Sequence, residues 1–120
     1  MKEPVFKILS TEQTDNSIVS LLQVDTSSHI FNGHFPDQPV VPGACMLQMV
    51  KDILEDAFKV SLRMAKADTI KFLNTVTPAT TGLKLLINHV AAEDQIRVAA
   101  ELSGEDVIFM KLQASFMLKV

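Results

Sequence analysis

One short stretch of the chain gathers residues from which a site for acyl chemistry could be built. Residues 33–43 hold three of the five prolines and two of the four glycines, and they include His34. An imidazole titrates near neutral pH, so it can both take and return a proton. Gly43 begins an apolar run that reads as a helix, and its backbone N–H would have no intrahelical partner. A carbonyl oxygen could accept that hydrogen bond, and the helix dipole would favour negative charge there.

The rest of this stretch would hold the histidine and the helix start in place. Prolines restrict φ at three points of the loop at low entropic cost, at Pro36, Pro39 and Pro42. Gly43 would also let a substrate approach the backbone closely. Ordinary alternatives stay open for both residues. His34 could bond loop backbone, and Gly43 could be a plain helix start after a proline.

The elements that must position these residues can be read from hydrophobic patterns. Residues 44–58 are apolar on most sides, which is typical of a central, buried helix. Before this helix, the β-rich segments 5–9 and 17–24 flank a turn signal at 14–16, and together they predict a hairpin. The last segment alternates with period two, which predicts a strand. Further strands are expected after the helix, at residues 63–72, 83–90 and 95–102.

This order of elements predicts an α+β domain. A helix that is apolar nearly all round needs cover, and a curved antiparallel sheet wrapped around it supplies most of that cover. The 120 residues are enough for one domain and short for two, so we expect a single domain over 1–120. No internal repeat, linker or low-complexity segment interrupts it.

Composition limits the classes of function. The chain is 48% hydrophobic, which suggests a buried interface or a lipophilic ligand channel, with a tightly packed core as the alternative. Nucleic acid is not an expected partner, because the net charge is −3 and there is no Trp or Tyr. The single cysteine, Cys45, excludes an internal disulfide and fits a reducing compartment. With no signal peptide and no membrane-length apolar run, we expect a cytoplasmic protein.

Two motifs resemble a known family over nearly the whole layout of the chain. The sequence HFPDQPVVPG at 34–43, followed by a mostly apolar helix, is similar to the active-site motif of β-hydroxyacyl-acyl-carrier-protein dehydratases of the FabZ/FabA type. The later KFLN at 71–74 with Pro78, just before a new strand, also resembles the family pattern. The resemblance implies a hot-dog fold and a dimer whose two sheets join edge to edge. It also implies that each active site is shared between protomers.

Two positions depart from the family pattern. Asp37 stands where the family often has glycine, on what we expect to be an exposed turn. Gln48 stands where the family helix carries Glu or Asp, five residues after the final glycine of the motif. A glutamine cannot be a general acid, but it can donate an N–H to a substrate hydroxyl or hold a water. Alternatively, Gln48 is a polar residue on a buried helix that bonds loop backbone.

Further residues have candidate roles with ordinary alternatives. An acyl tunnel could be lined by the apolar side chains of Met46, Leu47, Met49, Ile70 and Phe72, each of which could instead be core. An acidic carrier protein could dock on Lys59, Arg63 and Lys66, which could instead be a solvated surface. Cys45 is expected to be a small buried hydrophobe and not a nucleophile. We expect no metal and no cofactor, because no metal-ligand spacing, GxGxxG or P-loop is present.

The leading hypothesis is therefore a hydro-lyase acting on 3-hydroxyacyl thioesters carried by acyl carrier protein. It would give trans-2-enoyl thioesters and water, in fatty-acid synthesis or in a specialised polyene or polyketide-like pathway. One alternative is a non-catalytic hot-dog subunit that binds acyl carrier protein or pairs with an active homologue. Another is an acyl thioesterase. We expect a homodimer or a higher assembly of dimers, with His34 and Gln48 as its catalytic residues.

Overall fold

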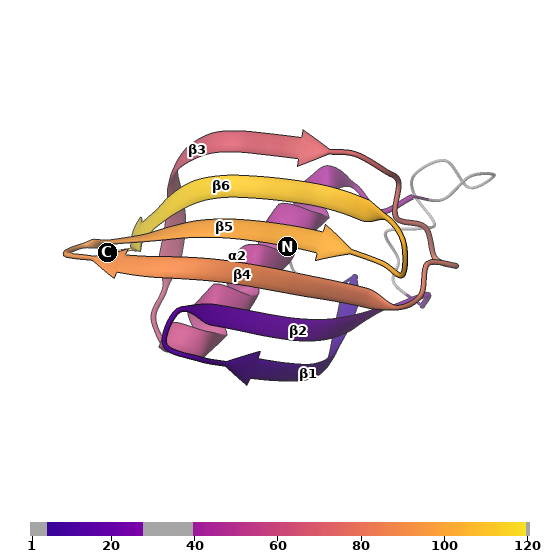
Figure 1. The fold of residues 1–120 in the computed structure, drawn as a ribbon, viewed down its shortest axis with the longest axis horizontal. Helices are drawn as coiled ribbons and strands as arrows, with labels where there is room; N and C mark the ends of the chain where they lie inside the picture. The colour runs from indigo at the N-terminus through magenta and orange to yellow at the C-terminus, as the bar shows by residue number, and fades with distance from the viewer. Residues whose placement is uncertain (1–4, 28–39, 120) are drawn as a thin grey trace.

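A curved antiparallel sheet packs around one helix in the computed structural model of the protein (Figure 1). The structure describes residues 5–27 and 40–119. Within them a hairpin comes first, then the helix, then four strands, as the sequence patterns predict. The elements are β1 (Phe6–Gln13), β2 (Ser17–Val24), α2 (Gly43–Phe58), β3 (Leu62–Phe72), β4 (Leu83–Ala92), β5 (Gln95–Ser103) and β6 (Ile108–Leu118).

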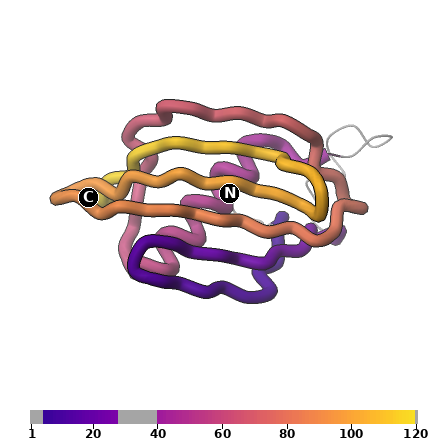
Figure 2. The backbone as a smooth tube through the Cα atoms, viewed as in Figure 1, coloured from indigo at the N-terminus to yellow at the C-terminus, as the bar shows by residue number. Residues whose placement is uncertain are grey.

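The sheet order places the hairpin that precedes the helix and the strand that follows it on opposite sides of the sheet, with β1 and β3 as the two edges. The order is β1-β2-β4-β5-β6-β3, and every neighbouring pair is antiparallel. The chain leaves the sheet after β2, runs through α2 across its concave side, and re-enters at the far edge as β3 (Figure 2). This is the hot-dog arrangement that the family resemblance implies, so the fold prediction is confirmed.

Helix α2 forms the centre of the core on one of its faces. Its buried residues recur at helical spacing: they are Cys45, Met46, Met49, Val50, Ile53 and Leu54. The opposite face carries exposed Ala44 and Asp52 and half-buried Gln48. Cover on every side was expected, but within the described residues the sheet covers the helix from one side only. The candidate residue Gln48 lies on the face that the sheet leaves uncovered.

The period-two pattern of β6 is confirmed by its burial. Met110, Leu112 and Phe116 face the helix and are at most 1% exposed. Lys111 and Gln113 on the other face are exposed. The pattern fails at three positions. Phe109 and Ser115 lie on the outward side but are 7% and 5% exposed, and Leu118 on the inward side is 52% exposed. The ring of Phe109 is buried because it packs against Gly104.

Strand β3 differs from the central strands because it is an edge. Its residues pair with β6 on one side only, with register shifts at Met64/Lys66 and Ala67/Thr69. Bulges are common at sheet edges, where they twist the strand and interrupt a regular template for pairing. Ile70 and Phe72 pair with inward-facing residues of β6, yet they are 39% and 49% exposed. They form apolar surface next to the helix N-terminus.

One histidine is buried in the core at the other end of the helix. His89 on β4 is 5% exposed, and its ring meets that of Phe58 edge-on, with centroids 5.0 Å apart. Among the described residues its Nε2 atom has no hydrogen-bond partner. His89 is therefore packed in the core and does not face solvent.

Candidate active site

The helix begins at the glycine that the sequence singles out. Pro42 is the N-cap residue, with φ −61° and ψ 146°, and its ring provides no side-chain acceptor for the first helical N–H groups. The first turn of α2 also contains no acidic residue. The positive end of the helix dipole is therefore not offset by a nearby carboxylate of its own first turn, which suits it for an electron-rich ligand atom.

The two motifs found separately in the sequence come together at this helix end. The N–H of Val41 donates a hydrogen bond of 2.8 Å to the carbonyl oxygen of Val76, and Val76 itself is fully buried. The segment after β3 is in turn held by β6, since Leu73 N–H donates to the carbonyl of Phe109 at 2.8 Å. The Asn74 side chain makes a further hydrogen bond of 2.8 Å to the β6 backbone. Long-range backbone bonds thus fix the helix start against the β3–β4 connection.

Phe72 explains why the first helical residue must be small. A Cβ built on Gly43 would lie 2.6 Å from Cζ of Phe72, closer than real Cβ contacts allow. The aromatic ring at the end of β3 therefore packs directly on the backbone of the helix start. A ligand that hydrogen-bonds this N-terminus would have the Phe72 ring as one wall of its environment.

Gln48 points from the uncovered face of α2 and has a partner that the sequence analysis missed. Its Nε2 donates to Oδ1 of Asp52 over 2.8 Å. The sequence predicts contacts of Gln48 with substrate, water or loop backbone, and not with another helix residue. The i,i+4 spacing was a visible signal, because residues four apart on a helix are neighbours.

The tunnel candidates divide into core and surface. Met46 and Met49 are 3% and 6% exposed and belong to the core, as their ordinary alternative predicts. Leu47 is half-buried and packs against that core. Ile70 and Phe72 remain as apolar side chains that face the helix side and reach the surface.

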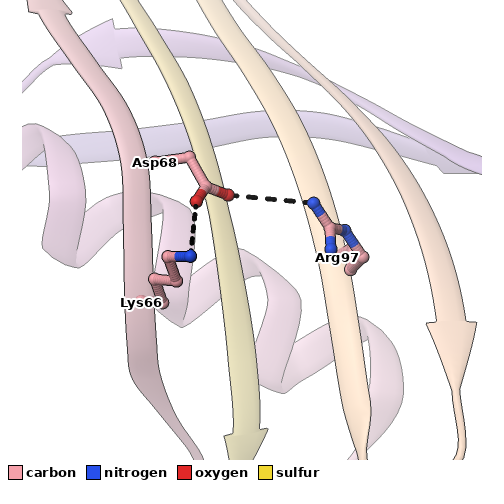
Figure 3. A network of polar contacts seen from close by, with 3 residues as sticks. All are labelled: Lys66, Asp68 and Arg97. Atoms are coloured by element: carbon pink, nitrogen blue, oxygen red, sulfur yellow. Dashed lines mark ion pairs between the residues drawn. The ribbon is translucent and has the colours of Figure 1, made fainter.

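The basic residues proposed for docking lie at the end of α2 and along β3. Lys59 ends α2 in the left-handed conformation and lies near Ile8 of β1, on the opposite side of the sheet order from β3. Arg63 and Lys66 lie on β3, where Lys66 Nζ pairs with Asp68 at 3.4 Å. Figure 3 shows the same carboxylate reaching Arg97 of β5, at 3.8 Å. Arg97 cannot be found from the sequence, because only the strand register across β6 brings its side chain within reach of β3.

Cys45 is buried beneath the helix start, and burial raises the pKa of its thiol. A raised pKa disfavours the thiolate that nucleophilic chemistry requires. The prediction that Cys45 is a small hydrophobe is therefore supported.

Several predicted site residues lie outside the described part of the chain. They are His34, Pro36 and Pro39, together with Asp37. Over residues 5–27 and 40–119, no group of three or more His, Cys, Asp or Glu side chains is placed to hold a metal ion. In the same ranges no helix is long and apolar enough to cross a membrane.

Comparison with known families gives one match over most of the chain. Residues 10–111 match the family model of ApeI-like proteins, described as ApeI dehydratase. A 3-hydroxyacyl-[acyl-carrier-protein] dehydratase FabZ of Francisella tularensis subsp. novicida is 30% identical over 105 residues, with 88% of this chain and 60% of the relative aligned. The FabZ of Streptococcus suis is 34% identical over 74 residues, 56% of this chain and 53% of the relative. The chain thus spans little more than half the length of these curated relatives.

Solved structures confirm the fold. A chain of the dehydratase heterocomplex ApeI:P from Xenorhabdus doucetiae matches with a TM-score of 0.77 and 22% identity, over 98% of this chain and 99% of that one. A thioesterase mutant from Staphylococcus aureus matches with a TM-score of 0.65 and 9% identity, over 96% and 93%. At such identities the likeness establishes a shared fold and leaves the chemistry to the site itself.

Proposed function

We propose that this chain, which belongs to the ApeI-like dehydratase family, removes water from 3-hydroxyacyl thioesters to give trans-2-enoyl thioesters. The observation that carries the proposal is the junction of the two motifs at the start of α2. There the Val41–Val76 hydrogen bond and the Phe72 ring fix a helix N-terminus that has no acidic residue in its first turn. Such a site suits a thioester oxygen on which negative charge builds during the reaction.

The reaction can be written with one base. His34 takes the proton from C2 of the acyl chain, and the electron pair moves toward the thioester oxygen, which accepts a hydrogen bond from the Gly43 N–H. The pair then returns to form the C2–C3 double bond as the C3–O bond breaks. The leaving hydroxyl takes the proton from His34 and departs as water. In this scheme no second acid is required, so Gln48 need only hold the hydroxyl by a hydrogen bond.

We further propose that the substrate is carried on an acyl carrier protein, as the names of the FabZ relatives suggest. Carrier proteins are acidic, and two cations, Lys66 and Arg97, pair with the carboxylate of Asp68, while Arg63 lies earlier on the same strand β3. Charge reversal at these three positions should weaken binding of the carrier protein at low salt, where such contacts are strongest. Lys59→Glu is the comparison variant, because among the described residues the ion pairs of Asp68 are made with Lys66 and Arg97 and not with Lys59. Equal affinity in all variants would contradict the docking site.

The functional unit is proposed to be a dimer joined through β3. This edge strand ends beside three exposed apolar side chains, Ile70, Phe72 and Leu73. Edge strands with such surface tend to pair with another chain. Ile70→Lys should shift the protein to monomer in light scattering, whereas Val90→Lys, at a still more exposed residue of a central strand, should not. A wild-type protein that is a stable, folded monomer at micromolar concentration would refute this proposal.

A non-catalytic subunit is the second candidate, and Gln48 is the observation that favours it. A solved structural neighbour is part of a dehydratase heterocomplex, so pairing with a different hot-dog chain has a precedent in this fold. The deciding experiment incubates the purified protein with 3-hydroxyacyl carrier proteins of several chain lengths and follows the loss of water by mass. Turnover supports the enzyme. Inactivity at every length, with turnover restored by a second hot-dog chain that co-purifies, supports the subunit. Release of free thiol would instead indicate a thioesterase.

A further inference from the structure

The side chains of Gln48 and Asp52 form a pair on the face of α2 that the sheet leaves uncovered. They are one helical turn apart, and the hydrogen bond from Gln48 Nε2 to Asp52 Oδ1 measures 2.8 Å. Gln48 is half-buried and Asp52 is exposed, and neither belongs to the hydrophobic core. The pair starts one turn after exposed Ala44, on the side of the helix that could face a substrate bound at the N-terminus.

This hydrogen bond decides which end of the Gln48 amide is available to a ligand. An ionised carboxylate only accepts hydrogen bonds, and so does the oxygen of an amide. Asp52 can therefore pair with the NH₂ group of Gln48 but not with its oxygen. The reversed amide would set two acceptors against each other. Oε1 of Gln48 must consequently be the atom turned away from Asp52.

We propose that Asp52 is a positioning residue that fixes Gln48 so that its Oε1 accepts a hydrogen bond from the 3-hydroxyl of the substrate. The inference rests on the proposed dehydration. Gln48 then acts as an acceptor, in contrast to the N–H donor expected from the sequence. By accepting this hydrogen bond, Gln48 fixes the orientation of the hydroxyl for the proton transfer of the proposed dehydration. The hydroxyl then receives a proton from the general acid, the C3–O bond breaks, and water leaves, while the amide neither gains nor loses a proton.

A purely structural pair would behave differently. Side-chain pairs at i,i+4 stabilise helices whatever reaction takes place nearby. If Asp52 only supports the helix, its removal should have the same effect with Gln or Glu at position 48. If Asp52 orients an amide, the two backgrounds should respond in opposite directions, because a carboxylate at 48 has no proton to donate and is repelled by Asp52.

The test is a double-mutant cycle on Gln48→Glu and Asp52→Ala, with kcat and KM measured from enoyl formation. In the wild-type background Asp52→Ala should lower kcat about 5- to 10-fold, the value of one oriented hydrogen bond, and leave KM within about twofold. In the Gln48→Glu background Asp52→Ala should leave kcat unchanged or raise it. Asp52→Asn retains an oxygen acceptor and should recover most of the loss. Asp56→Ala removes an exposed carboxylate one turn further along α2 and is the matched control.

The outcomes separate this inference from the function on which it rests. Wild-type turnover with an unaffected Asp52→Ala variant, or equal losses in both backgrounds, would overturn the positioning role and leave the dehydratase proposal standing. Absence of turnover in the wild type at every chain length would overturn both. Opposite responses in the two backgrounds, with unchanged helical circular dichroism, would support the inference.

Discussion

Replacing Gly43 by alanine tests the helix N-terminus as the site where the thioester oxygen binds. The added methyl group would lie 2.6 Å from Cζ of Phe72, so the ring must move. Because Phe72 is 49% exposed, it can swing toward solvent and lose only part of its contacts. Full burial of a phenylalanine contributes about 1.5–3 kcal/mol, so this loss is about 1 kcal/mol, and the better helix propensity of alanine offsets some of it.

The effect on catalysis should be much larger than the effect on stability. A methyl group at the helix start keeps a carbonyl oxygen from the backbone N–H, and loss of one such donor lowers kcat by about 10²–10³-fold. A domain with about 5–15 kcal/mol of stability stays folded after losing about 1 kcal/mol. The assay is enoyl formation at saturating substrate, corrected for the folded fraction from thermal unfolding. Turnover within about threefold of wild type would refute the assignment of Gly43.

Two further variants separate carbonyl binding from ring displacement. Gly104→Ala also drives a methyl group into a phenylalanine, 2.9 Å from Cε2 of Phe109. Phe109 is buried, so this variant should lose about 1–3 kcal/mol of stability by overpacking and keep its turnover per folded molecule. In the double variant Gly43→Ala/Phe72→Ala the ring is gone but the methyl group remains. Recovery of activity there would show that the ring, and not the N–H, was responsible.

His34→Ala should lower the rate of dehydration by about 10²–10⁴-fold with unchanged unfolding, and a near-full rate would place the base elsewhere. Gln48→Glu is nearly isosteric and should keep or raise the rate, whereas Gln48→Ala should lower it several-fold. Activity that appears only in Gln48→Glu would favour the non-catalytic subunit. His89→Leu should raise the free energy of unfolding by about 1–3 kcal/mol, measured in urea, because it removes a buried Nε2 without a described partner. A destabilised variant would imply that His89 has a partner.

The sequence predicts those parts of the fold that depend on local periodicity. The alternation in β6 and the helical spacing in α2 each report a buried face, and both are confirmed. Strand β1 extends to Gln13, beyond the predicted residues 5–9, because its pairing with β2 continues where its own hydrophobicity ends. Phe109 is buried although it lies on the outward side of β6, because a glycine in the preceding turn makes room for its ring. Such contacts depend on the neighbour and leave no local pattern.

The candidate site also contains residues that local sequence patterns reveal and residues that only the fold brings together. Gly43 and Gln48 can be located from motif spacing. Asp52 can also be identified from the sequence, because it stands four residues after Gln48 on one helix. Arg97 and Val76 cannot be identified from the sequence. Arg97 contacts its partner only through the register across the sheet, and Val76 only through a long connection. His34, the residue most important to the proposal, lies outside the described residues, and its role stays a prediction.

The hydrogen bond between Val41 and Val76 has a consequence for how this protein can vary in length. It ties the start of the helix to the connection between β3 and β4, so residues added between 73 and 80 would move the candidate site itself. The β4–β5 turn at Glu93, where φ is 43°, carries no such bond among those that join the described loops. An inserted peptide tag should therefore be tolerated at the β4–β5 turn. In relatives that keep the activity, the β3–β4 connection should have a constant length even where its sequence varies.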